Sequence, residues 1–194
     1  NGVLYATAGA RRAVVAIDAA TGETMWMYRL DEGERGNNAP RKGPGRGVAI
    51  HRGADRDTIF VISPGYQLIA LDALTGQLRA DFAEGGIVDL KLQLGVELDP
   101  VKAPIGASSP PIVVNDVVIV GAAFTFSGAP ESPEGLKGKV TAYDVNTGEL
   151  RWRFNTIPTA DESGFASWGG DSADYTGNAG VWAPMSADPE LGYV

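Results

Sequence analysis

One phrase occurs three times in the chain and constrains its fold more than any other feature. Residues 16–26, 70–78 and 142–152 share the pattern Ala-x-Asp-x-x-Thr-Gly, and the first and third copies end in tryptophan. The aspartates of successive copies are 54 and 72 residues apart. Periods of about 40 to 50 residues, lengthened by loops, are typical of propeller blades. We therefore expect an array of similar units.

Each copy of the phrase predicts a β-hairpin. The aspartate can accept hydrogen bonds from backbone N–H groups in the turn, and the glycine can adopt the positive φ that reverses the chain. The segments 58–63 and 112–120 are rich in β-branched residues, and Asn115-Asp116 marks a tight turn within the second of them. No long amphipathic helix is indicated. The fold class predicted is all-β, with sheets of four strands.

Aromatic residues accompany the repeats. Trp26 and Trp152 end two copies, and Phe82 follows the other. We expect these large side chains to fill the space between adjacent sheets. Between the repeats lie stretches rich in Gly, Pro and Ser, which are the predicted location of a functional site because long loops in compact domains commonly carry function. These stretches are residues 32–47, 87–109, 124–138 and 156–179.

The composition of the chain argues against several classes of partner and site. The net charge is −8, with 24 acidic and 16 basic side chains, so the field of the protein repels nucleic acid. The chain has no cysteine, which excludes disulfides, thiolate metal sites and cysteine nucleophiles. No apolar run approaches the roughly 18 residues that span a bilayer. Strand-like residues at 3–5 and 191–194 lead us to expect one partial domain, 1–194, truncated at both ends.

The phrase resembles the tryptophan-docking motif of the dehydrogenases that use pyrroloquinoline quinone (PQQ), the quinoprotein alcohol and glucose dehydrogenases. Residues 46–49 and 108–114 are similar to further segments of this family, and residues 182–188 are similar to its membrane glucose dehydrogenase branch. The resemblance implies a β-propeller of about eight blades when complete. Residues 1–194 would supply about three to four of these blades.

The resemblance also implies a cofactor site. Trp182 would stack on the planar quinone, and Arg46 would bond its carboxylates or quinone oxygens. Ser108 occupies the position of a hydroxyl that bonds a carboxylate of PQQ. Each residue has a structural alternative: Trp182 as a packing residue between blades, Arg46 as a solvated surface arginine, and Ser108 as a cap on the turn before Pro110.

Several features of the family pattern are absent. Pro44 and Gly45 stand where many members have adjacent cysteines, and Phe124 begins the loop that carries an acidic metal ligand in many members. Glu131 and Glu134 are surface carboxylates by default. The resemblance places the catalytic aspartate and a metal-binding asparagine beyond this stretch, so catalytic and metal residues stay unassigned. The lone histidine, His51, is expected to be solvated.

The implied function is that of a periplasmic dehydrogenase. It would oxidise a sugar, polyol or alcohol with PQQ and a divalent cation, usually calcium, and would pass electrons to ubiquinone or cytochrome c. The alternative is a non-enzymatic propeller with the same repeats that acts as a protein-binding scaffold in the bacterial envelope. The segments around Arg46 and Trp182 favour the enzyme, because a scaffold has no need of them.

Overall fold

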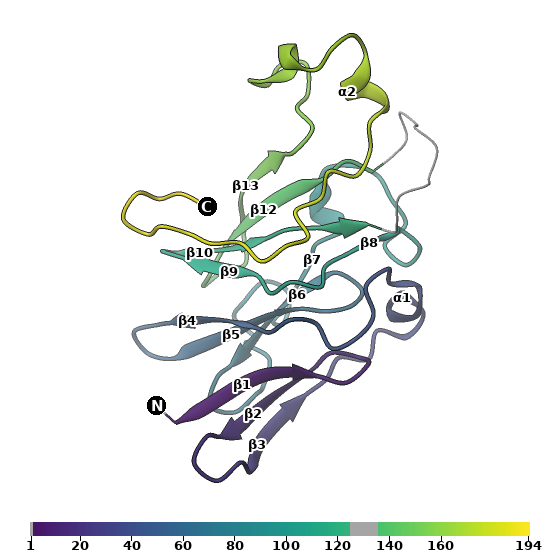
Figure 1. Cartoon of the computed structure of the whole chain (residues 1–194). Coiled ribbons are helices and arrows are strands. Elements are labelled where there is room, and N and C mark those ends of the chain that lie inside the picture. The colour runs from purple at the N-terminus through teal and green to yellow at the C-terminus, as the bar shows by residue number, and fades with distance from the viewer. Residues whose placement is uncertain (1, 125–135) are drawn as a thin grey trace.

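The computed structural model describes residues 2–124 and 136–194, and it arranges them as successive antiparallel sheets (Figure 1). The first sheet has the order β1 (Val3–Ala8), β2 (Ala13–Asp18), β3 (Thr24–Tyr28). The second has the order β4 (Ala49–Arg52), β5 (Asp57–Ile62), β6 (Gln67–Asp72), β7 (Ile87–Asp89). The third has the order β9 (Ile112–Val114), β10 (Val117–Val120), β12 (Lys139–Asp144), β13 (Leu150–Asn155).

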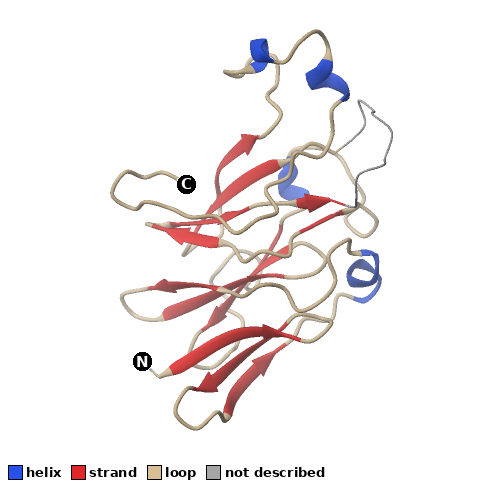
Figure 2. Ribbon diagram, viewed as in Figure 1, coloured by secondary structure: helices blue, strands red, loops and turns tan. Residues whose placement is uncertain are grey.

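The remaining elements are short. Strands β8 (Ile105–Gly106) and β11 (Ala123–Phe124) form a two-stranded ribbon, and the α-helices are α1 (Gly33–Asn38) and α2 (Ser172–Tyr175). Two 3-10 turns cover Leu92–Leu94 and Phe165–Ser167. Strands dominate the described residues (Figure 2), which confirms the all-β fold class. The stretch 87–109, expected to be irregular, in fact contributes β7 to the second sheet.

The repeated phrase forms the same turn in all three copies. Oδ1 of Asp18 accepts hydrogen bonds of 2.9 Å from the backbone N–H groups of Ala20 and Thr21, and the N–H of Gly22 donates to the Asp18 carbonyl at 2.8 Å. Asp72 and Asp144 make the equivalent bonds in their copies. The three glycines have φ values of 77°, 70° and 73°. The predicted hairpins are confirmed.

A fourth turn of this kind occurs near the C-terminal end of the chain. Oδ1 of Asp188 accepts bonds from the N–H groups of Glu190 and Leu191, and the N–H of Gly192 bonds the Asp188 carbonyl. Leu191 replaces the threonine of the phrase and Ser186 replaces its alanine, so this turn does not match the full sequence pattern. The expectation that 191–194 forms a strand is wrong for residues 191 and 192, because the turn hydrogen bonds place them in the reversal itself.

Asp144, the aspartate of the third copy of the phrase, makes stability depend on pH. Burial raises the pKa of Asp144, but bonds from the Thr147 N–H and the Arg151 guanidinium outweigh it, so the pKa lies below its ordinary value. A carboxyl whose folded pKa is depressed adds stability above its unfolded pKa of about 4, and this stability is lost as the pH falls through the folded pKa. We expect Asp144→Asn to lower the melting temperature at pH 7, and the gap from the parent protein to narrow toward pH 3. Melting curves at both pH values check this; a constant gap would contradict it.

The hydrophobic cores lie between the sheets rather than within one of them. Strands β5 and β6 are buried along nearly their whole length, because the second sheet packs against neighbours on both faces. One core contains Val14 of the first sheet with Ile59 and Leu71 of the second. A larger core joins the second and third sheets. This two-sided burial explains the continuous apolar runs that the sequence shows at 59–62 and 68–71.

Two of the three aromatic residues pack against the next sheet as predicted. Ring atoms of Trp26 lie 2.5 Å from where a Cβ on Gly76 would stand, and its Nε1 donates to the Ala73 carbonyl at 3.1 Å. Phe82 is fully buried and lies 3.2 Å from the corresponding point on Gly148. Trp152 remains 40% exposed and lines a groove with residues 192–194.

Candidate functional site

Two of the three predicted site residues lie just before an edge strand, and the third, Trp182, contacts the first of them. Arg46 precedes β4, Ser108 precedes β9, and Trp182 begins a segment whose neighbours Val181 and Met185 pack on the third sheet. Strands β4 and β9 are edge strands of their sheets and contact each other. The entries to these strands therefore lie at the end of the sheets opposite the Asp-Thr-Gly turns, because β4 and β9 run from their entries toward the end at which Asp72 and Asp144 lie.

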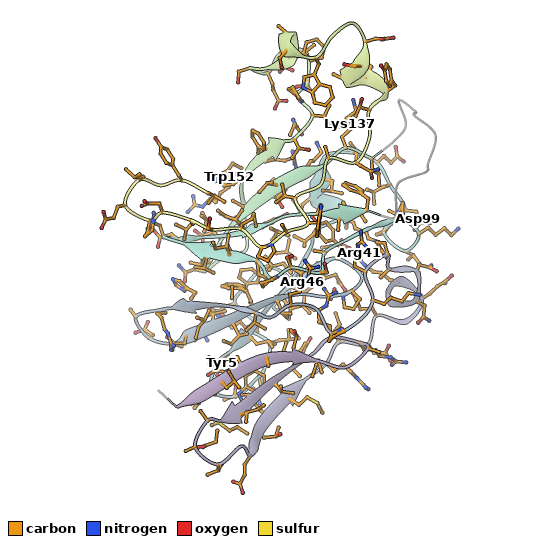
Figure 3. The ribbon with its side chains drawn as sticks, viewed as in Figure 1. Tyr5, Arg41, Arg46, Asp99, Lys137 and Trp152 are labelled. Atoms are coloured by element: carbon orange, nitrogen blue, oxygen red, sulfur yellow. The ribbon has the colours of Figure 1, made fainter. Side chains whose placement is uncertain are left out.

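Arg46 and Trp182 are in direct contact. The guanidinium carbon of Arg46 lies 5.8 Å from the centroid of the Trp182 ring, which is the geometry of a cation–π interaction. Figure 3 shows Arg46 at the centre of the molecule, between the second and third sheets. The structure thus brings together two residues that are far apart in the sequence.

The hydroxyl that joins this pair belongs to Ser109, the residue after Ser108. Nη1 of Arg46 donates to Oγ of Ser109 at 3.3 Å, and Oγ of Ser109 donates to the Trp182 carbonyl at 2.7 Å. Ser109 is buried, whereas Ser108 is partly exposed beside it. Because the two serines are adjacent and chemically identical, the sequence alone does not indicate which side chain points inward. We name Arg46, Ser109 and Trp182 the entry cluster.

The entry cluster has the chemistry that a flat anion requires. The Trp182 side chain is large, planar and 58% exposed, so one of its surfaces is open to a ligand. The Arg46 guanidinium supplies a fork of N–H donors suited to carboxylates. A second guanidinium, that of Arg41, lies on the same 39–48 segment and donates to the Phe124 carbonyl at 3.2 Å. The residues present therefore fit a planar tricarboxylate such as PQQ.

No metal centre is identified within residues 2–124 and 136–194. No group of three His, Cys, Asp or Glu side chains in these ranges could hold an ion. Phe124, at the start of the loop where an acidic ligand was considered, is a buried strand residue of β11. Glu131 and Glu134 lie outside the described residues. His51 differs from its expected solvated state, since its Nδ1 is buried without a hydrogen-bond partner.

None of the helices in the described parts of the chain is both long and apolar enough to cross a membrane.

Comparison with known proteins places the chain in a family. The model of the glucose, ethanol and alcohol dehydrogenase β-propeller domain, a PQQ domain, matches residues 1–194. The quinohemoprotein alcohol dehydrogenase ADH IIB of Pseudomonas putida is 32% identical, over 98% of this chain and 26% of its own length. The quinoprotein glucose dehydrogenase of Escherichia coli (strain K12) is 29% identical, over 95% of this chain and 23% of its own.

Solved structures agree with the sequence comparison. The solved structure of the quinohemoprotein alcohol dehydrogenase ADHIIG of Pseudomonas putida HK5 superimposes with a TM-score of 0.69 at 32% identity, covering 98% of this chain and 26% of that one. The chain spans about a quarter of the length of the curated relatives it matches. Its sheets are consequently part of a propeller. The chain belongs to the PQQ β-propeller family of glucose, ethanol and alcohol dehydrogenases.

Proposed function

We propose that the complete protein is a PQQ-dependent dehydrogenase that oxidises a small alcohol, polyol or sugar. The observation that carries the proposal is the entry cluster, in which a guanidinium and an exposed indole are in contact near the entries to the edge strands β4 and β9, in a chain of this family. Relatives include alcohol, glycerol and glucose dehydrogenases, which supports this range of substrates.

The residues of the entry cluster have distinct tasks in this proposal. Trp182 offers the surface on which the ring system stacks, worth about 1 to 3 kcal/mol for planar bases on aromatic side chains. Arg46 holds a carboxylate or quinone oxygen by charge-assisted hydrogen bonds. Ser109 fixes the Trp182 backbone and the Arg46 guanidinium together, and Ser108 provides a further hydroxyl. When bound, PQQ supplies a two-electron oxidant.

The remaining components of the reaction lie beyond these residues. A divalent cation, calcium by family resemblance, would polarise the quinone carbonyl, and an aspartate from another blade would take the substrate proton. We propose ubiquinone or cytochrome c as electron acceptor and the periplasm as location. The resemblance supports these assignments.

The proposal is tested on the complete protein, freed of metal by chelation and dialysed. Titration with PQQ in the presence of Ca²⁺ is followed by calorimetry, and reduction of an artificial electron acceptor is assayed with ethanol, glycerol and glucose. We expect saturable PQQ binding, and activity with at least one substrate only when PQQ and Ca²⁺ are both present. Absence of PQQ binding would overturn the proposal and would favour the scaffold alternative.

A further inference from the structure

A buried arginine, Arg12, bonds the segments that carry Arg46 and Ser109. Arg12, in the turn between β1 and β2, is 5% exposed and has a φ of 52°. Nη1 donates to the Ile62 carbonyl at 2.8 Å and to the Ala107 carbonyl at 2.6 Å. Nη2 donates to the Arg41 carbonyl at 2.8 Å, and Nε makes a longer bond of 3.4 Å to the Gly43 carbonyl.

Three of these carbonyls, those of Arg41, Gly43 and Ala107, belong to the segments that carry Arg46 and Ser109. Gly43 is three residues before Arg46, and Ala107 is two residues before Ser109. Ile62 is the last residue of β5 in the second sheet. The Arg12 guanidinium therefore connects the segment carrying Arg46 to the segment carrying Ser109.

The 43–47 segment is shaped to cover the Arg12 side chain. Its three glycines, Gly43, Gly45 and Gly47, all have positive φ, at 97°, 76° and 127°. A Cβ on Gly45 would lie 2.8 Å from Nε of Arg12 and 2.9 Å from its Cδ. Glycine is required at this position on both counts, since a side chain would be strained and would collide with the arginine. The glycines of this segment thus allow the backbone to pack closely on the Arg12 side chain, and a phosphate-binding role is not needed to explain them.

An arginine suits this position better than a lysine. The guanidinium presents five N–H donors in a rigid plane, whereas an ammonium has three donors at one point, and the acceptors here come from four carbonyls. Burial lowers the pKa of Arg12 to about 10, an effect that the Glu32 carboxylate opposes. The side chain is therefore still charged at neutral pH, and its bonds are charge-assisted.

We propose that Arg12 is the positioning residue of the cofactor site: it holds the 39–48 and 105–109 segments in register so that Arg46, Ser109 and Trp182 meet. We call the hydrogen bonds from Arg12 to these two segments the clamp. The inference rests on the proposed function for its ligand, PQQ, but the clamp itself forms without the ligand. The chain has no cysteine, so no disulfide can join these segments. The guanidinium of Arg12 joins them instead, through hydrogen bonds to backbone carbonyl groups.

The test uses Arg12→Lys in the complete protein, with two readouts. Hydrogen exchange measured by mass spectrometry is expected to rise in peptides covering 39–48 and 105–109 and to stay unchanged in β12. PQQ binding, measured by calorimetry, is expected to weaken about tenfold through lost charge-assisted bonds. Gly45→Ala is the second variant: it should raise exchange in 39–48 while leaving 105–109 near the parent value.

Arg79→Lys is the matched control. Arg79 is also buried, and it bonds Oγ1 of Thr58 at 2.7 Å and Oδ2 of Asp81 at 2.9 Å, away from the entry cluster. It should lower the melting temperature without affecting PQQ affinity or exchange in the two segments. Unchanged exchange in both segments of Arg12→Lys would overturn the clamp, and should that variant fail to fold, unchanged exchange at 39–48 in Gly45→Ala would do so. Raised exchange together with a parent protein that binds no PQQ would instead refute only the proposed function.

Discussion

Phe82→Ala is expected to lower the free energy of unfolding by about 3 to 5 kcal/mol, the range for truncating a buried aromatic side chain. Phe82 is fully buried between the second and third sheets, and its ring centroid is 5.5 Å from that of Phe60. The lost side chain would leave a cavity at a point where Ala83 also donates a backbone hydrogen bond to the Thr147 carbonyl at 2.9 Å. The neighbouring backbone is thus held in place and cannot easily collapse.

Chemical denaturation of the complete protein measures this loss. Leu74→Ala is the control, because Leu74 lies in the second copy of the phrase but is 78% exposed, and such surface changes are usually within about 0.5 kcal/mol. Equal losses for the two variants would show that Phe82 does not join the sheets in the manner described.

Trp182→Ala is expected to weaken PQQ binding by about 1 to 3 kcal/mol while leaving the fold intact, because an exposed indole contributes stacking surface and little core packing. Arg46→Ala should act similarly through lost charge-assisted bonds, about 1.5 to 3 kcal/mol. Calorimetric titration with PQQ, with melting curves alongside, measures both effects.

Trp26→Ala separates binding from stability. Trp26 packs on Gly76 between the first two sheets, so its loss should lower the melting temperature and leave PQQ affinity nearly unchanged. Trp152→Ala is also expected to act on stability rather than on affinity. The division of the tryptophans fails if Trp182→Ala destabilises the protein at full affinity while Trp152→Ala weakens binding alone.

The repeat predicted the fold well because its signal is local. Aspartate and glycine at fixed spacing determine a turn through bonds among neighbouring residues, so three hairpins were identified without knowledge of the tertiary structure. The same spacing from Asp188 to Gly192 was readable in principle. The fourth turn keeps its aspartate bonds although serine stands in the alanine position and leucine in the threonine position, which shows that the aspartate and the glycine suffice for these bonds.

The site was harder to predict because its contacts are not local. The resemblance pointed to Arg46 and Trp182, and their contact is visible only in three dimensions. Arg11 and Arg12 are adjacent and chemically identical, yet Arg11 pairs with Asp31 at the surface while Arg12 is buried. Which of the two side chains is buried depends on how the chain reverses at the β1–β2 turn. The inward orientation of Ser109 escaped prediction for the same reason.

The bonds of Arg12 also bear on how blades cooperate in folding. In architectures built from repeats, each unit contacts only its neighbours, so stability approximates a sum of intrinsic and nearest-neighbour terms. Arg12 lies on the first sheet but bonds Ala107, at the entrance to the third. Its side chain therefore couples the first sheet to the third, which is not its immediate neighbour. This coupling forms only when all three sheets are assembled. Loss of this coupling would let one blade detach without the others, so unfolding would become less cooperative even where the total stability changed little.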